Sequence, residues 1–104
     1  HNFQKYQPQR PLKSFLFSKD PKNAIELVNE TLKTGADPKL LTRLILRDFR
    51  EEYLLKLENI STTESKFFDF AIRELLWSLE QRTDDYTAHI PLELALIKIA
   101  TQNS

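Results

Sequence analysis

The segment from residue 90 to residue 100 constrains the fold of this chain more than any other. It reads Ile-Pro-Leu-Glu-Leu-Ala-Leu-Ile-Lys-Ile-Ala, with charged side chains only at Glu93 and Lys98. At 100° per residue, some of its apolar residues share one arc of a helix and others cover much of the remaining surface. The first group is Leu92, Ala95, Leu96 and Ile99, and the second is Leu94, Ile97 and Ala100. A helix that is apolar nearly all round must be enclosed on several sides, so we expect this segment to be the central helix of an all-α domain.

Capping residues predict further helices before this segment, whereas no strand-like run exists to pair with it in a sheet. Asp20-Pro21 and Asp37-Pro38 each place an N-cap aspartate before a proline at the first helical position. We expect Gly35 to end the first of these helices in the left-handed conformation. The loop that follows is so short that the second helix should turn back against the first. The residues from Ser61 to Glu64 form a capping box and start a third helix.

The predicted domain is a compact bundle of four to five helices over residues 12–104. Its long helices run from about 38 to 57 and from about 62 to 82, its closing helix starts near 91, and a short helical turn occupies 12–18. Residues 1–11 are polar and rich in Gln and Pro, which predicts a linker or an arm. In the second helix one arc holds Leu40, Leu41, Leu44, Ile45 and Leu55, and another holds Leu46, Phe49, Tyr53 and Leu57. The third helix is expected to bury Phe68, Ala71, Ile72, Leu75, Leu76 and Leu79.

The composition excludes most familiar catalytic machinery. A single glycine cannot supply a phosphate-binding or dinucleotide-binding loop, because each of these needs several glycines at fixed spacing. Two histidines and no cysteine leave no zinc-type cluster. We therefore expect this polypeptide to bind no cofactor and no ATP, and to have no enzymatic activity of its own.

Charge and hydropathy limit the classes of partner. Fifteen basic and fifteen acidic residues cancel, which argues against a sequence-independent binder of nucleic acid or of anionic membranes. No apolar run approaches the roughly 18 residues that a bilayer-spanning helix needs. The expected protein is soluble and cytoplasmic, without direct nucleic-acid or membrane contacts.

Aromatic residues off the main arc of the third helix are the strongest candidates for binding. Phe67, Phe70 and Trp77 form a second stripe on that helix, and aromatic side chains dominate binding hot spots. The alternative is that the N-terminal segment or the closing helix covers them within the domain. Leu94 and Ile97, which lie off the main arc of the closing helix, complete the set of candidate interface residues.

Polar residues give weaker candidates. Arg43, Arg47 and Arg50 mark a solvated edge of the second helix and are candidates for weak phosphate contacts, although the acidic residues among them favour an internally paired face. The adjacent carboxylates at 84–85 suit a solvated turn better than a metal or acid–base site, because no histidine or third carboxylate stands at motif spacing to them. His89, beside the closing helix, suits packing or capping better than a titrating switch.

Several packing motifs resemble those of one known family. This family is the third domain of the gamma/tau subunit of the bacterial DNA polymerase III clamp loader. The closing Leu92-Glu-Leu-Ala-Leu-Ile-Lys-Ile99 resembles the last collar helix of that family, and Leu75-Leu-Trp-Ser78 resembles the step before it. The segments 20–27 and 35–38 are similar to its opening helical hairpin. The resemblance covers about residues 12–101, although the segment 77–93 is longer than usual and Pro91 replaces a small helical residue.

The resemblance implies an oligomerisation domain of the collar type. In such a loader, five collar domains pack in a ring and hold the ATPase modules in register while a sliding clamp is opened for DNA replication. The implied partners are other loader subunits, bound through apolar helix faces that exceed the needs of one core. The family's ATP and zinc sites have no counterpart among these residues. The alternatives are the collar of the delta-type subunit, a helical adaptor that binds a peptide or helix beside Trp77, and a small nucleic-acid binder that uses the arginines.

Overall fold

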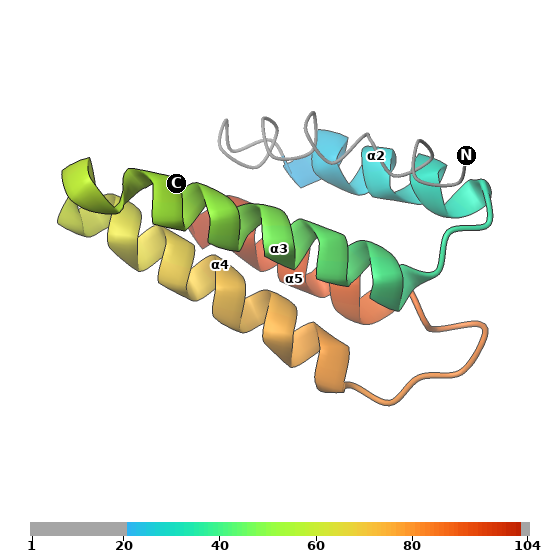
Figure 1. The fold of residues 1–104 in the computed structure, drawn as a ribbon. Helices are drawn as coiled ribbons and strands as arrows, with labels where there is room; N and C mark the ends of the chain where they lie inside the picture. The colour runs from blue at the N-terminus through green and yellow to red at the C-terminus, as the bar shows by residue number, and fades with distance from the viewer. Residues whose placement is uncertain (1–20, 103–104) are drawn as a thin grey trace.

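Residues 21–102, which the computed structural model describes, form a bundle of helices without strands (Figure 1). The elements are α2 (Pro21–Lys33), α3 (Pro38–Lys56), the 3₁₀ turn η2 (Leu57–Asn59), α4 (Thr62–Glu80) and α5 (Ile90–Gln102). The all-α prediction is confirmed for this part of the chain. The arm predicted at 1–11, the helical turn predicted at 12–18 and the cap residue Asp20 lie outside the described residues.

Local capping starts α3 and α4 where the sequence predicts them. The Asp37 carboxylate accepts a hydrogen bond from the Leu40 amide at 2.9 Å, and Pro38 opens α3. At α4 the Ser61 hydroxyl accepts from the Glu64 amide at 3.1 Å, while the Glu64 carboxylate accepts from the Ser61 amide at 3.3 Å. Each cap satisfies amide groups that the start of a helix leaves without an intrahelical partner. The far ends of both helices fall one or two residues before the predicted positions, which is the usual uncertainty at a helix end.

Gly35 turns the chain after α2 with a φ of 94°. Its amide donates to the Leu32 carbonyl at 3.0 Å, which satisfies one of the acceptors at the end of the helix. Apart from Gly35 itself and its two chain neighbours, no heavy atom of the described residues lies within 4 Å of the position that a Cβ would occupy. The turn therefore requires glycine for its backbone conformation and not for close packing.

The helix α5 lies at the centre of the core, as its apolar circumference predicts. Its buried residues are Pro91, Leu92, Ala95, Leu96, Ile99 and Ala100. The buried side packs against α4 and α2, and less extensively against α3. Val28 of α2, Ile45 of α3 and Leu75 of α4 are buried in the same cluster, so each described α-helix contributes to one core.

An aromatic cluster joins α3 to α4. The ring of Phe49 lies 6.1 Å from that of Phe67 and 6.2 Å from that of Phe68, measured between ring centroids. Tyr53 stacks on Phe68 with 5.2 Å between centroids, and its hydroxyl lies 2.8 Å from the Ser65 hydroxyl. Aromatic pairs of this kind contribute about 0.5–1.5 kcal/mol each beyond the area that they bury. The aromatic side chains of α3 therefore pack mainly against α4.

The expected packing of α2 against α3 is wrong. Although the connection between them is short, the principal partner of α2 among the described helices is α5. Figure 1 shows α2 set apart from α3, with their connection at one end of the bundle. The physical reason is that α3 directs its largest apolar side chains toward α4, whereas α5 is apolar on enough of its circumference to pack against both α4 and α2.

The predicted arcs of α3 also need correction. The buried line runs through Leu41, Ile45 and Phe49, and Tyr53 continues it with partial burial. Steps of four residues advance 40° around a helix, so this line crosses from one predicted arc to the other. Leu55 lies away from the line and is 81% exposed. Which leucines are buried depends on how α3 crosses its neighbouring helices, and a projection of a single helix cannot represent that crossing.

Candidate functional site

The candidate interface residues fall into different environments. Phe67 is 9% exposed and belongs to the aromatic cluster between α3 and α4, so at this residue the structure agrees with the alternative in which the aromatic side chain is covered within the domain. Phe70 is partly buried against the same core. Trp77 is half-buried. Leu94 and Ile97 are the most accessible of the five, because α5 turns them away from its buried side.

The solvent side of α5 carries an apolar stripe, which we call the α5 outer face. It consists of Ile90, Leu94 and Ile97, which are 41%, 43% and 43% exposed. Their spacing of four and three residues places them on one side of the helix. Thr101, one turn further, donates its hydroxyl to the Ile97 carbonyl at 2.8 Å. The central helix of the core thus also offers an apolar surface to solvent.

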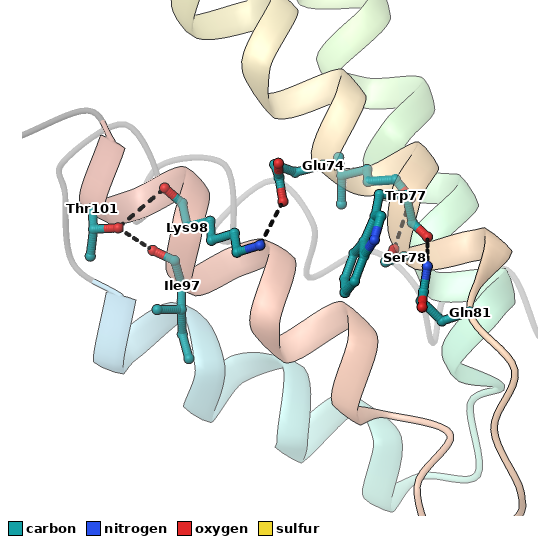
Figure 2. A network of polar contacts seen from close by, with 8 residues as sticks. Glu74, Trp77, Ser78, Gln81, Ile97, Lys98 and Thr101 are labelled. Carbon is teal, nitrogen blue, oxygen red and sulfur yellow. Dashed lines mark hydrogen bonds and ion pairs between the residues drawn. The ribbon is translucent and has the colours of Figure 1, made fainter.

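A small polar cluster lies where α4 meets α5 (Figure 2). The Lys98 ammonium lies 3.7 Å from Glu74 Oε1 and 5.1 Å from the centre of the Trp77 ring. The Trp77 carbonyl of α4 accepts a hydrogen bond at 3.1 Å from the side chain of Gln81, the cap residue that follows this helix. Because Lys98 is held between a carboxylate and an aromatic face, Trp77 already has a cationic partner within the domain. These contacts favour a positioning role for Trp77 at the α4–α5 contact.

The three arginines line an open groove between α3 and α4 with a volume of about 360 Å³. Its lining residues are Arg43, Leu46, Arg47, Arg50, Ile72 and Leu76. Leu76 was expected in the core but is 48% exposed. The reason is that α4 turns Phe68 and Leu75 into the core, where Phe68 meets Phe49 of α3, and this leaves Leu76 on the flank of the helix. The groove was missed from the sequence because its two sides come from different helices, and only the arginine spacing indicated one of them.

The carboxylate of Asp84 organises the loop between α4 and α5. It accepts hydrogen bonds from the Thr87 hydroxyl at 3.0 Å, from the Tyr86 amide at 2.9 Å and from the Thr87 amide at 3.0 Å. The Thr87 hydroxyl, followed by the Tyr86 and Thr87 amides, lowers the pKa of Asp84 below its ordinary value of 3.8. This geometry is that of a turn, in which the carboxylate is used for structure.

A second, more polar hollow lies between the end of α2 and the loop before α5, with a volume of about 550 Å³. Asp37, Asp85 and His89 contribute to its lining. Within residues 21–102, however, no group of three or more His, Cys, Asp or Glu residues is placed to hold a metal ion. None of the described helices is long and apolar enough to cross a lipid bilayer.

Among the residues that the structure describes, the α5 outer face and the arginine-lined groove each have a chemistry that suits a macromolecular partner. The first is apolar, and the second combines an apolar floor with positive charge. No protein-family model, no curated protein and no solved structure matches this chain.

Proposed function

We propose that this domain is an oligomerisation module that packs against neighbouring subunits through the α5 outer face, as the collar domains of a clamp loader do. The observation that carries the proposal is the exposure of Ile90, Leu94 and Ile97 on the helix that also forms the centre of the core. Contiguous apolar surface on a folded domain marks interaction sites. The resemblance of the same helix to the last collar helix of the gamma/tau subunit supports the choice of partner.

The size of this face indicates that a second surface takes part. Burying a whole Leu or Ile side chain contributes about 1.5–3 kcal/mol, so burying the exposed part of each of these three contributes about 1 kcal/mol. A complex with a dissociation constant of 1 μM requires about 8 kcal/mol. The α5 outer face alone is too small, and a stable assembly needs further contact area.

The end of α3 supplies such a surface. Leu54 and Leu55 are 50% and 81% exposed there, and Leu57, the first residue of η2, is 52% exposed. A ring is built from head-to-tail contacts, in which each subunit uses two different surfaces. Two apolar surfaces on different helices meet this requirement, so we assign the end of α3 to the neighbour on the other side.

The experiment compares Leu94→Asp/Ile97→Asp with the unmodified chain. Mass is measured by light scattering during size exclusion over a range of concentrations, and capture by the other subunits of a clamp loader is measured in parallel. We expect the double variant to lose assembly in both assays while its melting temperature changes little, because both side chains face solvent.

Leu76→Asp is the matched control, because Leu76 is exposed to a similar extent on another surface. It should assemble like the unmodified chain. Leu55→Asp should weaken assembly, since it changes the second surface. Assembly of the double variant at the level of the unmodified chain would refute the proposal, and so would an unmodified chain that neither self-associates nor binds any loader subunit.

A further inference from the structure

We propose that the groove between α3 and α4 binds an acidic amphipathic helix of a partner protein. In this arrangement an apolar side chain of the partner lies on the groove floor, and its carboxylates pair with the arginines at the rim. This site is separate from the α5 outer face, shares no residue with it, and serves a different kind of contact.

The groove floor is apolar and accessible. Leu46 of α3 and Ile72 and Leu76 of α4 form it, and Leu76 is 48% exposed. A volume of about 360 Å³ lies at the lower end of the range of roughly 300–1,000 Å³ for ligand clefts. A groove between two parallel ridges of side chains suits the apolar stripe of a helix, which presents anchors at spacings of three and four residues.

The rim supplies charge at a matching spacing. Arg43, Arg47 and Arg50 follow one another at four and three residues, so they lie on one side of α3 over about 10 Å. Carboxylates at the same spacing on a partner helix can meet all three, and guanidinium groups bind carboxylates with two parallel hydrogen bonds. Charge complementarity therefore selects an acidic partner.

The ion pairs already present near the rim do not prevent a partner from binding the arginines. Arg47 Nε lies 4.0 Å from Glu51 Oε2, and both side chains are more than half exposed. An exposed pair of this kind contributes only about 0–1 kcal/mol, so a partner carboxylate can replace Glu51 at little cost. On α4, Arg73 Nε lies 3.0 Å from Asp69 Oδ2, and neither of these residues lines the groove.

The apolar floor favours a protein over a nucleic acid. Phosphate contacts position a nucleic acid through charge and hydrogen bonds alone, and they would leave Leu46, Ile72 and Leu76 without a partner. The chain's own first 20 residues are also unsuited in charge, since they contain Lys5, Arg10, Lys13 and Lys19 but only one acidic residue, Asp20. A partner helix with both apolar and acidic residues satisfies both parts of the groove.

The test uses the full chain and a fluorescent synthetic helix with leucines at spacings of three and four residues and glutamates on both flanks. A second peptide with lysine at every glutamate position is the charge control, and a DNA duplex of equal charge is the nucleic-acid control. Fluorescence anisotropy should show saturable binding of the acidic peptide, no binding of the basic peptide, and weakening as salt is raised.

Matched variants locate the binding site. Arg43→Glu/Arg50→Glu should weaken binding of the acidic peptide at least tenfold, whereas Lys22→Glu/Arg82→Glu, which changes the net charge equally at exposed residues elsewhere, should stay within twofold. Leu76→Asp should weaken it at least tenfold, whereas Leu55→Asp should not. Leu94→Asp/Ile97→Asp should bind the peptide normally, which separates this site from the assembly surface.

Three results would overturn the proposal. They are equal binding by the groove variants and the unmodified chain, absence of saturable binding of the acidic peptide, and tighter arginine-dependent binding of the DNA duplex than of the acidic peptide. Circular dichroism of each variant ensures that a loss of binding is measured on folded protein.

Discussion

At the scale of single residues, Ala95 tests whether α5 is central. Its side chain has no exposed surface and lies in the core cluster. Ala95→Asp would bury a charge without a partner, which costs several kcal/mol against a total stability of about 5–15 kcal/mol. We expect the variant to be unfolded or to melt far below the unmodified chain in circular dichroism. Leu94→Asp, one residue away on the exposed side, should melt nearly normally, and a stable Ala95→Asp variant would show that α5 is not central.

Asp84 gives a pH-dependent prediction. Hydrogen bonds from Thr87 and Tyr86 lower its pKa in the folded chain below the ordinary 3.8. The stabilisation that these bonds provide is therefore fully present above about pH 3.8 and is lost as the pH falls through the lowered pKa. Asp84→Asn should consequently lower the melting temperature at neutral pH, and the difference from the unmodified chain should shrink in acid.

The same residue can be followed directly by carboxyl NMR titration. Thr87→Val removes the largest cause of the lowered pKa, so the Asp84 pKa should rise toward its ordinary value. Thr83→Val removes a hydroxyl from the same loop that is not among the donors to Asp84, and it should leave the titration unchanged. An Asp84 pKa that does not respond to Thr87→Val would contradict the assignment.

At the scale of elements, the turn after α2 offers a test of backbone strain. Gly35 has a φ of 94° with open space around its α-carbon. Gly35→Ala should cost about 1–2 kcal/mol, because an L side chain disfavours the left-handed region even where there is room for it. Gly35→Asn should cost less, since asparagine tolerates this region better. Urea unfolding measures both, and equal stability of the alanine variant and the unmodified chain would contradict the argument.

Elements also show which features the sequence can predict. The starts of α3 and α4 were predicted because a cap involves residues only three apart, as at Asp37 and Ser61. The burial of Leu92 and Ile99 was predicted because α5 has few polar residues to orient it otherwise. The exposure of Leu55 and Leu76 could not be predicted from the sequence, because it depends on where α3 crosses α4. The groove depends on the same crossing, which no single helix determines.

The candidate interface residues also divide into those that one helix determines and those that depend on the packing of helices against each other. The sequence predicts Leu94 and Ile97 as candidate interface residues, because one helix cannot bury its whole circumference in so small a domain. Phe67 and Trp77 share a helix, but only their neighbours distinguish them. Phe67 packs against the ring of Phe49 of α3, whereas the Lys98 ammonium lies over the ring of Trp77. Which residue packs against an aromatic side chain depends on the tertiary structure, so an aromatic stripe alone does not identify an interface.

At the scale of the whole molecule, one continuous core predicts one cooperative transition. Every described α-helix contributes side chains to the same cluster. Trp77, the only tryptophan of the chain, lies between α4 and α5 and reports on their contact. Urea unfolding followed by its fluorescence should therefore coincide with unfolding followed by helicity, as two-state behaviour requires. Separate midpoints would mean that part of the bundle unfolds independently, and Trp77→Phe identifies any signal that does not come from this residue.

The packing of α2 on α5 has a consequence for co-translational folding. These are the first and last of the described helices, and among the described helices the principal partner of α2 is α5. At a synthesis rate of about 5–20 residues per second, α2 waits on the order of several seconds before α5 has been translated. Throughout that interval the side of α2 that packs on α5 in the folded domain lacks this partner and is accessible to chaperones and proteases. The order of these helices along the sequence thus makes the packing of α2 depend on a segment that is translated much later.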